Sequence, residues 1–141
     1  MAKTRILLID DEIALTEILK INLEETGRFE VRVENRGAAA VATACAFKPD
    51  VVFLDVIMPD MDGGQVAAEL RGDPRLSHVP IVYLTAIVSK QETRRTDGVI
   101  GGHAFIAKPV GVAEVIACIE RHLTASPAPV DGAQANAGGT P

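Results

Sequence analysis

Five polar residues follow directly on short apolar runs that have the length of buried strands. In chain order they are Asp10, Asp11, Asp55, Thr85 and Lys108. The carboxyl ends of parallel strands meet at one edge of an α/β sheet, and ligands bind there. Three carboxylates gathered at such an edge repel one another, so either one of them has a raised pKa or a cation lies among them.

This set of side chains is typical of phosphoryl chemistry. Mg²⁺ suits a site with a few carboxylates, several waters and room for a phosphate oxygen. Lys108 would give a fixed positive charge for a phosphoryl oxygen, and the Thr85 hydroxyl a neutral hydrogen-bond donor for another. Asp55 lies on the central strand and is the carboxylate best placed to act as a nucleophile that forms an acyl phosphate.

The elements that must position these residues alternate along the chain. Strands are predicted at 6–9, 31–33, 51–54, 81–84 and 103–107. Two of these runs, 51–54 and 81–84, are apolar throughout, which is typical of strands buried on both faces. Helical spacing of apolar residues lies between them, for example from Leu15 to Leu23 and from Val112 to Leu123. The pattern predicts an α/β fold: a doubly wound, five-stranded parallel sheet with five helices.

The chain of 141 residues fits one domain, which we expect to cover residues 3–124. From 125 to 141 the sequence is rich in Ala, Gly and Pro, so a disordered tail is predicted.

The fourth helical stretch has no apolar residue from Ser89 to Gly98, so a helix there has no face to bury. Asp60 and Asp62 are interpreted as turn and cap residues before Gly63.

Composition excludes several classes of protein. The formal net charge is −5, which argues against a sequence-independent nucleic-acid binder. Cys45 and Cys118 form neither a disulfide framework nor a metal-binding spacing, and we expect both to be small buried residues in a reducing compartment. No apolar run is long enough for a signal peptide or a membrane span, so no membrane partner and a cytoplasmic location are expected.

The motifs resemble those of the receiver domain of two-component response regulators. The resemblance covers residues 3–123 and rests on four segments in this order: Ile9-Asp10-Asp11-Glu12, Leu54 to Gly63, Leu84-Thr85-Ala86 and Phe105 to Pro109. It implies a flavodoxin-like fold of five parallel strands in the order 2-1-3-4-5. It also implies that Asp55 accepts a phosphoryl group from a sensor histidine kinase or a histidine phosphotransfer protein.

The same resemblance assigns a role to each matching residue around Asp55. Mg²⁺ would be bound by Asp55, by Asp11 directly, by Asp10 largely through water, and by the backbone carbonyl of Ile57. Thr85 and Lys108 would hold the phosphoryl oxygens.

A switch is implied as well. Phe105 lies at the position of the family's switch aromatic, which turns inward as the Thr85 hydroxyl moves toward the phosphate. Ala86 matches the small residue that leaves space above the phosphorylated carboxylate. As an enzyme, such a protein would catalyse only its own phosphorylation and dephosphorylation.

No effector domain is recognisable after Leu123, so the expected output is protein–protein contact in a single-domain regulator of the chemotaxis or phosphorelay type. The polar fourth helix argues against a packed dimer interface on that helix. Ile57 and Ile87 lie two residues after Asp55 and Thr85, and our hypothesis is that they hinder water and lengthen the life of the phosphoryl group.

Three other classes of protein share part of this pattern. A haloacid-dehalogenase-like phosphatase needs a second aspartate at the place of Ile57. A flavodoxin-like flavin carrier needs a phosphate loop without carboxylates and aromatic residues around the flavin, and the chain has one Tyr and no Trp. A pseudo-receiver, which uses the same fold as a constitutive docking module, remains as the alternative.

Overall fold

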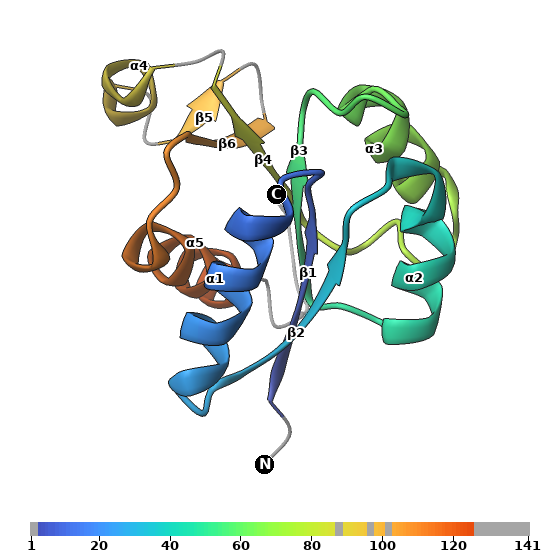
Figure 1. Ribbon diagram of the computed structural model, residues 1–141, viewed down its shortest axis with the longest axis horizontal. Helices are drawn as coiled ribbons and strands as arrows, with labels where there is room; N and C mark the ends of the chain where they lie inside the picture. The colour runs from blue at the N-terminus through green and yellow to red at the C-terminus, as the bar shows by residue number, and fades with distance from the viewer. Residues whose placement is uncertain (1–2, 87–88, 96–97, 101–102, 126–141) are drawn as a thin grey trace, which may run out of the picture.

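The computed structural model describes residues 3–86, 89–95, 98–100 and 103–125. Of the predicted tail, only Ala125 belongs to these described residues. Helices lie on both faces of one sheet (Figure 1). In chain order the elements are β1 (Thr4–Ile9), α1 (Ile13–Glu25), β2 (Phe29–Glu34), the 3-10 turn η1 (Gly37–Ala39), α2 (Ala40–Phe47), β3 (Val51–Asp55), α3 (Gly63–Gly72), β4 (Ile81–Thr85), α4 (Lys90–Arg95), β5 (Val99–Ile100), β6 (His103–Ala107) and α5 (Val112–Ala125).

The sheet has the strand order β2-β1-β3-β4-β6-β5. The first five strands in this order are all parallel, so the predicted doubly wound fold with order 2-1-3-4-5 is confirmed, with β6 in the fifth place. The prediction of five strands misses β5, which pairs antiparallel with the start of β6. The chain turns at Gly98, whose φ is +78°, and the Gly98 carbonyl accepts a hydrogen bond from the Phe105 N–H at 2.7 Å.

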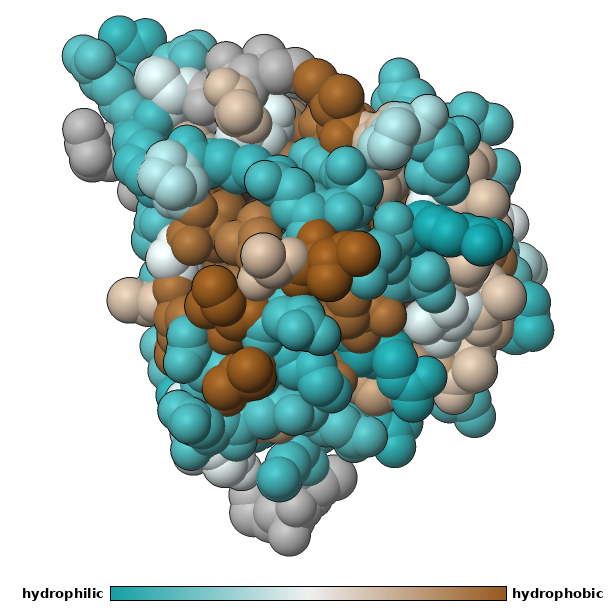
Figure 2. All heavy atoms as spheres, viewed as in Figure 1, coloured by the Kyte–Doolittle hydropathy of each residue, from teal (hydrophilic) through white to brown (hydrophobic). Residues whose placement is uncertain are grey.

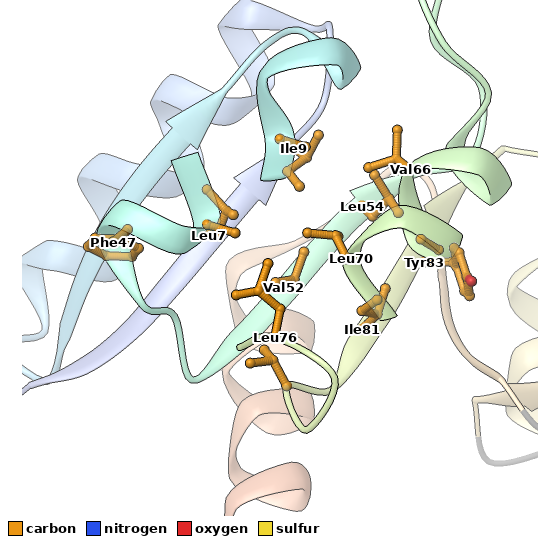
Figure 3. Packing of buried hydrophobic residues seen from close by; sticks show 14 of the residues in the cluster. Leu7, Ile9, Phe47, Val52, Leu54, Val66, Leu70, Leu76, Ile81 and Tyr83 are labelled. Atoms are coloured by element: carbon orange, nitrogen blue, oxygen red, sulfur yellow. The ribbon is translucent and has the colours of Figure 1, made fainter. Parts of the chain in front are cut away.

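The core consists of two layers, because successive residues of a buried strand point to opposite faces of the sheet. On β1, Leu7 and Ile9 pack with the apolar residues of α2 and α3 (Figure 3). Their neighbours Ile6 and Leu8 pack with α1 and α5 on the other face. All four side chains are fully buried. The strand that carries Asp10 is thereby fixed from both sides.

Side-chain caps fix the segments around the C-terminal edge of the sheet. Asp62 is the N-cap of α3, and its Oδ1 accepts a hydrogen bond from the Gly64 N–H at 2.7 Å. Asp60 accepts hydrogen bonds from the N–H groups of Gly37 at 3.2 Å and Ala38 at 3.1 Å. These two bonds hold the pKa of Asp60 below its ordinary value. Asp60 therefore caps η1, 22 residues earlier in the chain, as well as lying in the turn expected for it.

Helix α4 is six residues long and is held by polar contacts. Ser89 and Glu92 form a reciprocal capping box, with bonds of 2.8 and 3.0 Å between side chain and backbone. Lys90 Nζ lies 3.2 Å from the carbonyl of Ala107 and 3.0 Å from both carboxylate oxygens of Glu114. These contacts tie α4 to the end of β6 and to the first turn of α5, without an apolar face.

Strand β2 forms one edge of the sheet, and α1 covers part of that edge. The Val31 N–H donates to Glu24 Oε2 at 3.0 Å, and the Val31 carbonyl accepts from Lys20 Nζ at 3.1 Å. Lys20 and Glu24 are themselves an i,i+4 ion pair at 3.5 Å.

Helix α1 also carries exposed apolar side chains. Ile13, Ile18 and Ile21 are each more than half exposed. Figure 2 shows hydrophobic side chains reaching the surface over the region of α1.

Candidate functional site

The ends of β1, β3, β4 and β6 bring the predicted site residues to one edge of the sheet. Asp10 follows β1, and Asp55 ends β3, which pairs with β1 through Ile9 and Leu54. Thr85 ends β4, and its carbonyl accepts a hydrogen bond from the Lys108 N–H at 2.8 Å. Asp10, Asp55 and Thr85 are buried.

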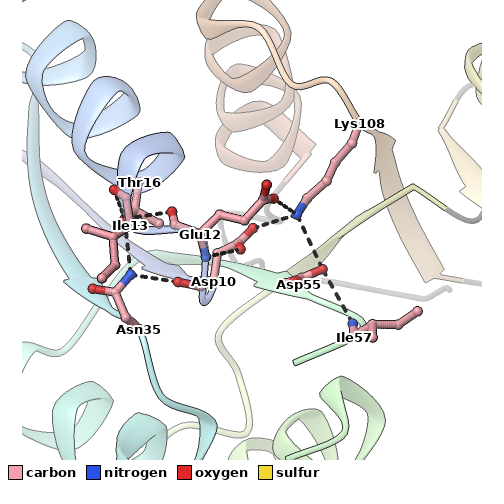
Figure 4. A network of polar contacts seen from close by, with 8 residues as sticks. All are labelled: Asp10, Glu12, Ile13, Thr16, Asn35, Asp55, Ile57 and Lys108. Carbon is pink, nitrogen blue, oxygen red and sulfur yellow. Dashed lines mark hydrogen bonds and ion pairs between the residues drawn. The ribbon is translucent and has the colours of Figure 1, made fainter. Parts of the chain in front are cut away.

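Lys108 lies between carboxylates from two strand ends (Figure 4). Its Nζ is 3.1 Å from Asp10 Oδ2 and 3.6 Å from Asp55 Oδ1, and it also contacts Glu12 Oε1. Burial alone would lower the pKa of Lys108, but its contacts with Glu12, Asp10 and Asp55 raise that pKa above its ordinary value. The ammonium group therefore stays charged and neutralises part of the cluster.

Asp10, Asp11 and Asp55 form a compact trio. Each offers one carboxylate oxygen, and these three atoms lie within 4.8 Å of one another. Burial and the neighbouring charge of Asp10 raise the pKa of Asp55 to about 6, against the opposing effect of Lys108. Burial also raises the pKa of Asp10. Negative charge is thus destabilised at this site unless a cation balances it.

The trio fits a hard divalent cation such as Mg²⁺. Its donors are carboxylate oxygens, which Mg²⁺ prefers, and Asp11 is more exposed than the other two, so water can remain on an ion. Asp10 Oδ2 is a buried oxygen that has an ion pair with Lys108 but no well-formed hydrogen bond. Ile57 donates its N–H to Asp55 Oδ1 at 3.4 Å, and the role of its carbonyl as a ligand stays a prediction.

Supporting residues that the sequence analysis missed hold Asp10 in place. Asn35 Nδ2 donates to the Asp10 carbonyl at 2.7 Å and to Thr16 Oγ1 at 3.1 Å. The Glu12 N–H donates to Asp10 Oδ1 at 2.9 Å. The sequence did hold one indication of the role of Asn35. This residue directly follows β2, which pairs with β1, so it lies at the same edge of the sheet as Asp10.

Phe105, the predicted switch aromatic, is half-buried on β6. Its ring stacks on Tyr83 of β4, with 5.2 Å between the ring centroids. The Tyr83 hydroxyl accepts a hydrogen bond from Arg71 Nη1 at 3.1 Å, which links this pair to α3. His103 is exposed and meets the Tyr83 ring edge-on, with 5.6 Å between the ring centroids.

Three residues that follow Asp55 and Thr85 carried predictions: Ile57 and Ile87 were expected to hinder water, and Ala86 to leave space above the phosphorylated carboxylate. The Ile57 side chain is exposed and extends away from the Asp55 carboxylate in Figure 4. Ala86 is exposed at the end of β4. Ile87 lies outside the described residues.

The two cysteines lie away from this site. Cys118 is buried as expected, whereas Cys45 is only half-buried, with Sγ 3.7 Å from Asp73 Oδ2.

Residues 6–120 match the model of the response regulator receiver domain. The chain belongs to this family, whose members take a phosphoryl group from histidine kinases and bind Mg²⁺ at an acidic site. Within the residues that the structure describes, no helix has the length and apolar character needed to cross a lipid bilayer.

Two similar regulators are longer than this chain. The DNA-binding dual master transcriptional regulator RpaA of Synechocystis sp. is 35% identical over 120 residues, which are 84% of this chain and 48% of the relative. The response regulator PleD of Caulobacter vibrioides is 36% identical over 107 residues, 75% of this chain and 23% of that protein. The chain therefore spans less than half the length of these two relatives.

Solved structures show the same fold over most of their length. The chemotaxis protein CheY4 of Vibrio cholerae has a TM-score of 0.72 at 27% identity, and the match covers 85% of this chain and 98% of that one. The signal receiver domain of a signal transduction histidine kinase from Syntrophus aciditrophicus has a TM-score of 0.68 at 31% identity, covering 86% and 90%.

Proposed function

We propose that this chain acts as a response regulator receiver whose Asp55 accepts a phosphoryl group in a Mg²⁺-dependent reaction. The donor would be a sensor histidine kinase or a histidine phosphotransfer protein, which implies the cytoplasm as compartment. The observation that carries the proposal is the position of Asp55: a buried carboxylate at the end of a central strand, grouped with Asp10 and Asp11, with Lys108 Nζ 3.6 Å away.

In the proposed transfer, a carboxylate oxygen of Asp55 attacks the phosphorus of a phosphohistidine. The new O–P bond forms as the P–N bond breaks, and the electron pair returns to the imidazole nitrogen, which takes up a proton. When bound by the three aspartates, Mg²⁺ would supply positive charge that balances the negative charge of the phosphoryl oxygens.

Lys108 and Thr85 complete the proposed site. The Lys108 ammonium stays protonated and would hold a second phosphoryl oxygen, exchanging its present contact with Asp55 for one with the transferred group. Thr85 would donate its hydroxyl to a third oxygen. The inward movement of Thr85 would open space for Phe105, whose ring now stacks on Tyr83.

The output proposed is phosphorylation-dependent contact with another protein. The proposal is supported by apolar side chains at the rim of the site and on the adjoining helix. Ile57 and Ile13 are 62% and 60% exposed, and α1 continues with Ile18 and Ile21. Exposed apolar side chains of this kind are available for contact with another protein.

Intact mass after incubation with acetyl phosphate and Mg²⁺ tests the phosphoryl transfer. We expect one added phosphoryl group on the wild-type protein and none on Asp55→Asn or in the presence of a chelator. Asp50→Asn is the matched control, because Asp50 precedes the same strand at its other end and is exposed; this variant should still be phosphorylated. If no mass is added, even with a phosphorylated histidine donor, the chain is a constitutive docking module instead.

A further inference from the structure

One of the three carboxylates around Lys108 stands apart from the other two. Asp10 and Asp55 belong to the trio whose oxygen atoms converge, whereas Glu12 does not. The Glu12 side chain is 57% exposed, compared with 0% for Asp10 and 7% for Asp55. Lys108 therefore reaches from the buried trio to a carboxylate at the rim.

The oxygen atoms that a cation would use are the ones that Lys108 now contacts. Asp10 Oδ1 accepts the Glu12 N–H at 2.9 Å, whereas the buried Oδ2 has no well-formed hydrogen bond, so Oδ2 is the oxygen more available to a cation. Lys108 Nζ lies 3.1 Å from that oxygen and 3.6 Å from Asp55 Oδ1. A divalent cation bound to these two oxygens would lie near the ammonium group, and the two positive charges would repel each other. Such repulsion weakens the hold of Asp10 and Asp55 on Lys108 when a divalent cation binds.

We infer that Glu12 is a positioning residue, which retains Lys108 at the rim of the site once the trio has bound a divalent cation. This inference rests on the proposed function and adds a residue to it. Glu12 is the one of the three partners that a cation in the trio leaves available. Holding the displaced ammonium there stabilises the cation-bound form and keeps Lys108 beside the position of the incoming phosphoryl group.

A double-mutant cycle measured by Mg²⁺ titration calorimetry tests the inference. Glu12→Gln keeps the shape of the side chain. Because Glu12 would be the remaining partner of Lys108 in the cation-bound form, its loss should cost more there than in the metal-free form, and we expect Mg²⁺ affinity to weaken by about two- to fivefold. In a Lys108→Met background the same change should have less than about a 1.5-fold effect, because the residue that Glu12 holds is absent. Glu17→Gln, an exposed carboxylate one turn further along α1, is the matched control and should leave the affinity unchanged.

The cycle separates this role from a plain electrostatic one. Equal weakening in both backgrounds would mean that Glu12 acts only through its negative charge, and would overturn the inference. Unchanged or tighter binding by Glu12→Gln in the wild-type background would also overturn it. If Lys108→Met does not fold, Lys108→Arg keeps the charge, and there the effect of Glu12→Gln must persist. Absence of Mg²⁺ binding by the wild-type protein would instead refute the metal-dependent function itself, and the inference with it.

Discussion

Replacing Asp55 by asparagine should stabilise the metal-free protein at neutral pH. The pKa of Asp55 is raised from 3.8 to about 6, chiefly by burial and by the charge of Asp10. One pKa unit corresponds to about 1.4 kcal/mol, so ionised Asp55 lowers the free energy of unfolding by about 3 kcal/mol. Asparagine has nearly the same shape and no charge, and Lys108 keeps its contacts with Asp10 and Glu12. For a domain of this size, about 3 kcal/mol corresponds to a rise in Tm of roughly 10 °C.

The increase in the free energy of unfolding that Asp55→Asn causes should depend on pH in a defined direction. A carboxyl group with a raised pKa in the folded state destabilises the protein only where it is ionised, so the penalty is absent below about pH 4. It grows as the pH rises from 3.8 to about 6 and is complete above that value. Urea denaturation in the presence of a chelator should therefore show a gain of about 1 kcal/mol for Asp55→Asn at pH 4.5 and about 3 kcal/mol at pH 7.5.

The control for this measurement is Glu69→Gln, which removes one negative charge from an exposed residue on α3. Its free energy of unfolding should stay within about 0.5 kcal/mol of the wild type at both pH values. A gain for Asp55→Asn that is the same at pH 4.5 and 7.5 would refute the reasoning, since the effect would then not arise from ionisation. Destabilisation by Asp55→Asn would refute it as well.

Three further predictions concern the same edge of the sheet. Millimolar Mg²⁺ should raise the Tm of the wild-type protein at pH 7.5, and equal Tm values with Mg²⁺ and with chelator would argue against a metal site. Gly63→Ala should lower the free energy of unfolding by about 1–3 kcal/mol, because a Cβ there would lie 2.4 Å from the Asp55 carbonyl oxygen. Gly72→Ala has open space around the added atom and should instead raise the free energy of unfolding by up to about 1 kcal/mol. Similar effects of the two changes in urea denaturation would contradict this prediction. Glu114→Gln should speed amide exchange in α4 by weakening the contact with Lys90, whereas Glu120→Gln on the same helix should not; equal exchange in both variants would count against it.

Most of the fold could be predicted because the central strands are continuous apolar runs and the other parallel strands carry shorter apolar patterns. The predicted strands 51–54 and 81–84 differ from β3 and β4 by one residue each, and 103–107 matches β6. Strand β5 could not be predicted, because two residues carry no periodic signal and the strand is defined only by its antiparallel pairing with β6. The contact of Asp60 with Gly37 and Ala38 also depends on tertiary structure, which no local spacing encodes.

The site shows the same division between local and distant information. The topology of a parallel sheet is enough to group residues that end neighbouring strands, as for Asp10, Asp55 and Lys108. The contact of Glu12 with Lys108 joins residues 96 positions apart, and it depends on the reach of two long side chains. Asn35 likewise acts through a carbonyl 25 residues earlier in the chain. Such contacts follow from packing, so the sequence alone does not predict them.

The cover that α1 places over β2 has a consequence for how this protein can assemble. An edge strand offers unpaired N–H and C=O groups on which a strand of another molecule can add, the first step of domain swapping or aggregation. Lys20 and Glu24 already use both such groups of Val31 in the middle of β2. At the other edge, β5 has only two residues and runs against β6. Among the described residues, neither edge offers a long, free template, so we expect partners and further copies of this chain to associate through helices and loops and not by extending the sheet.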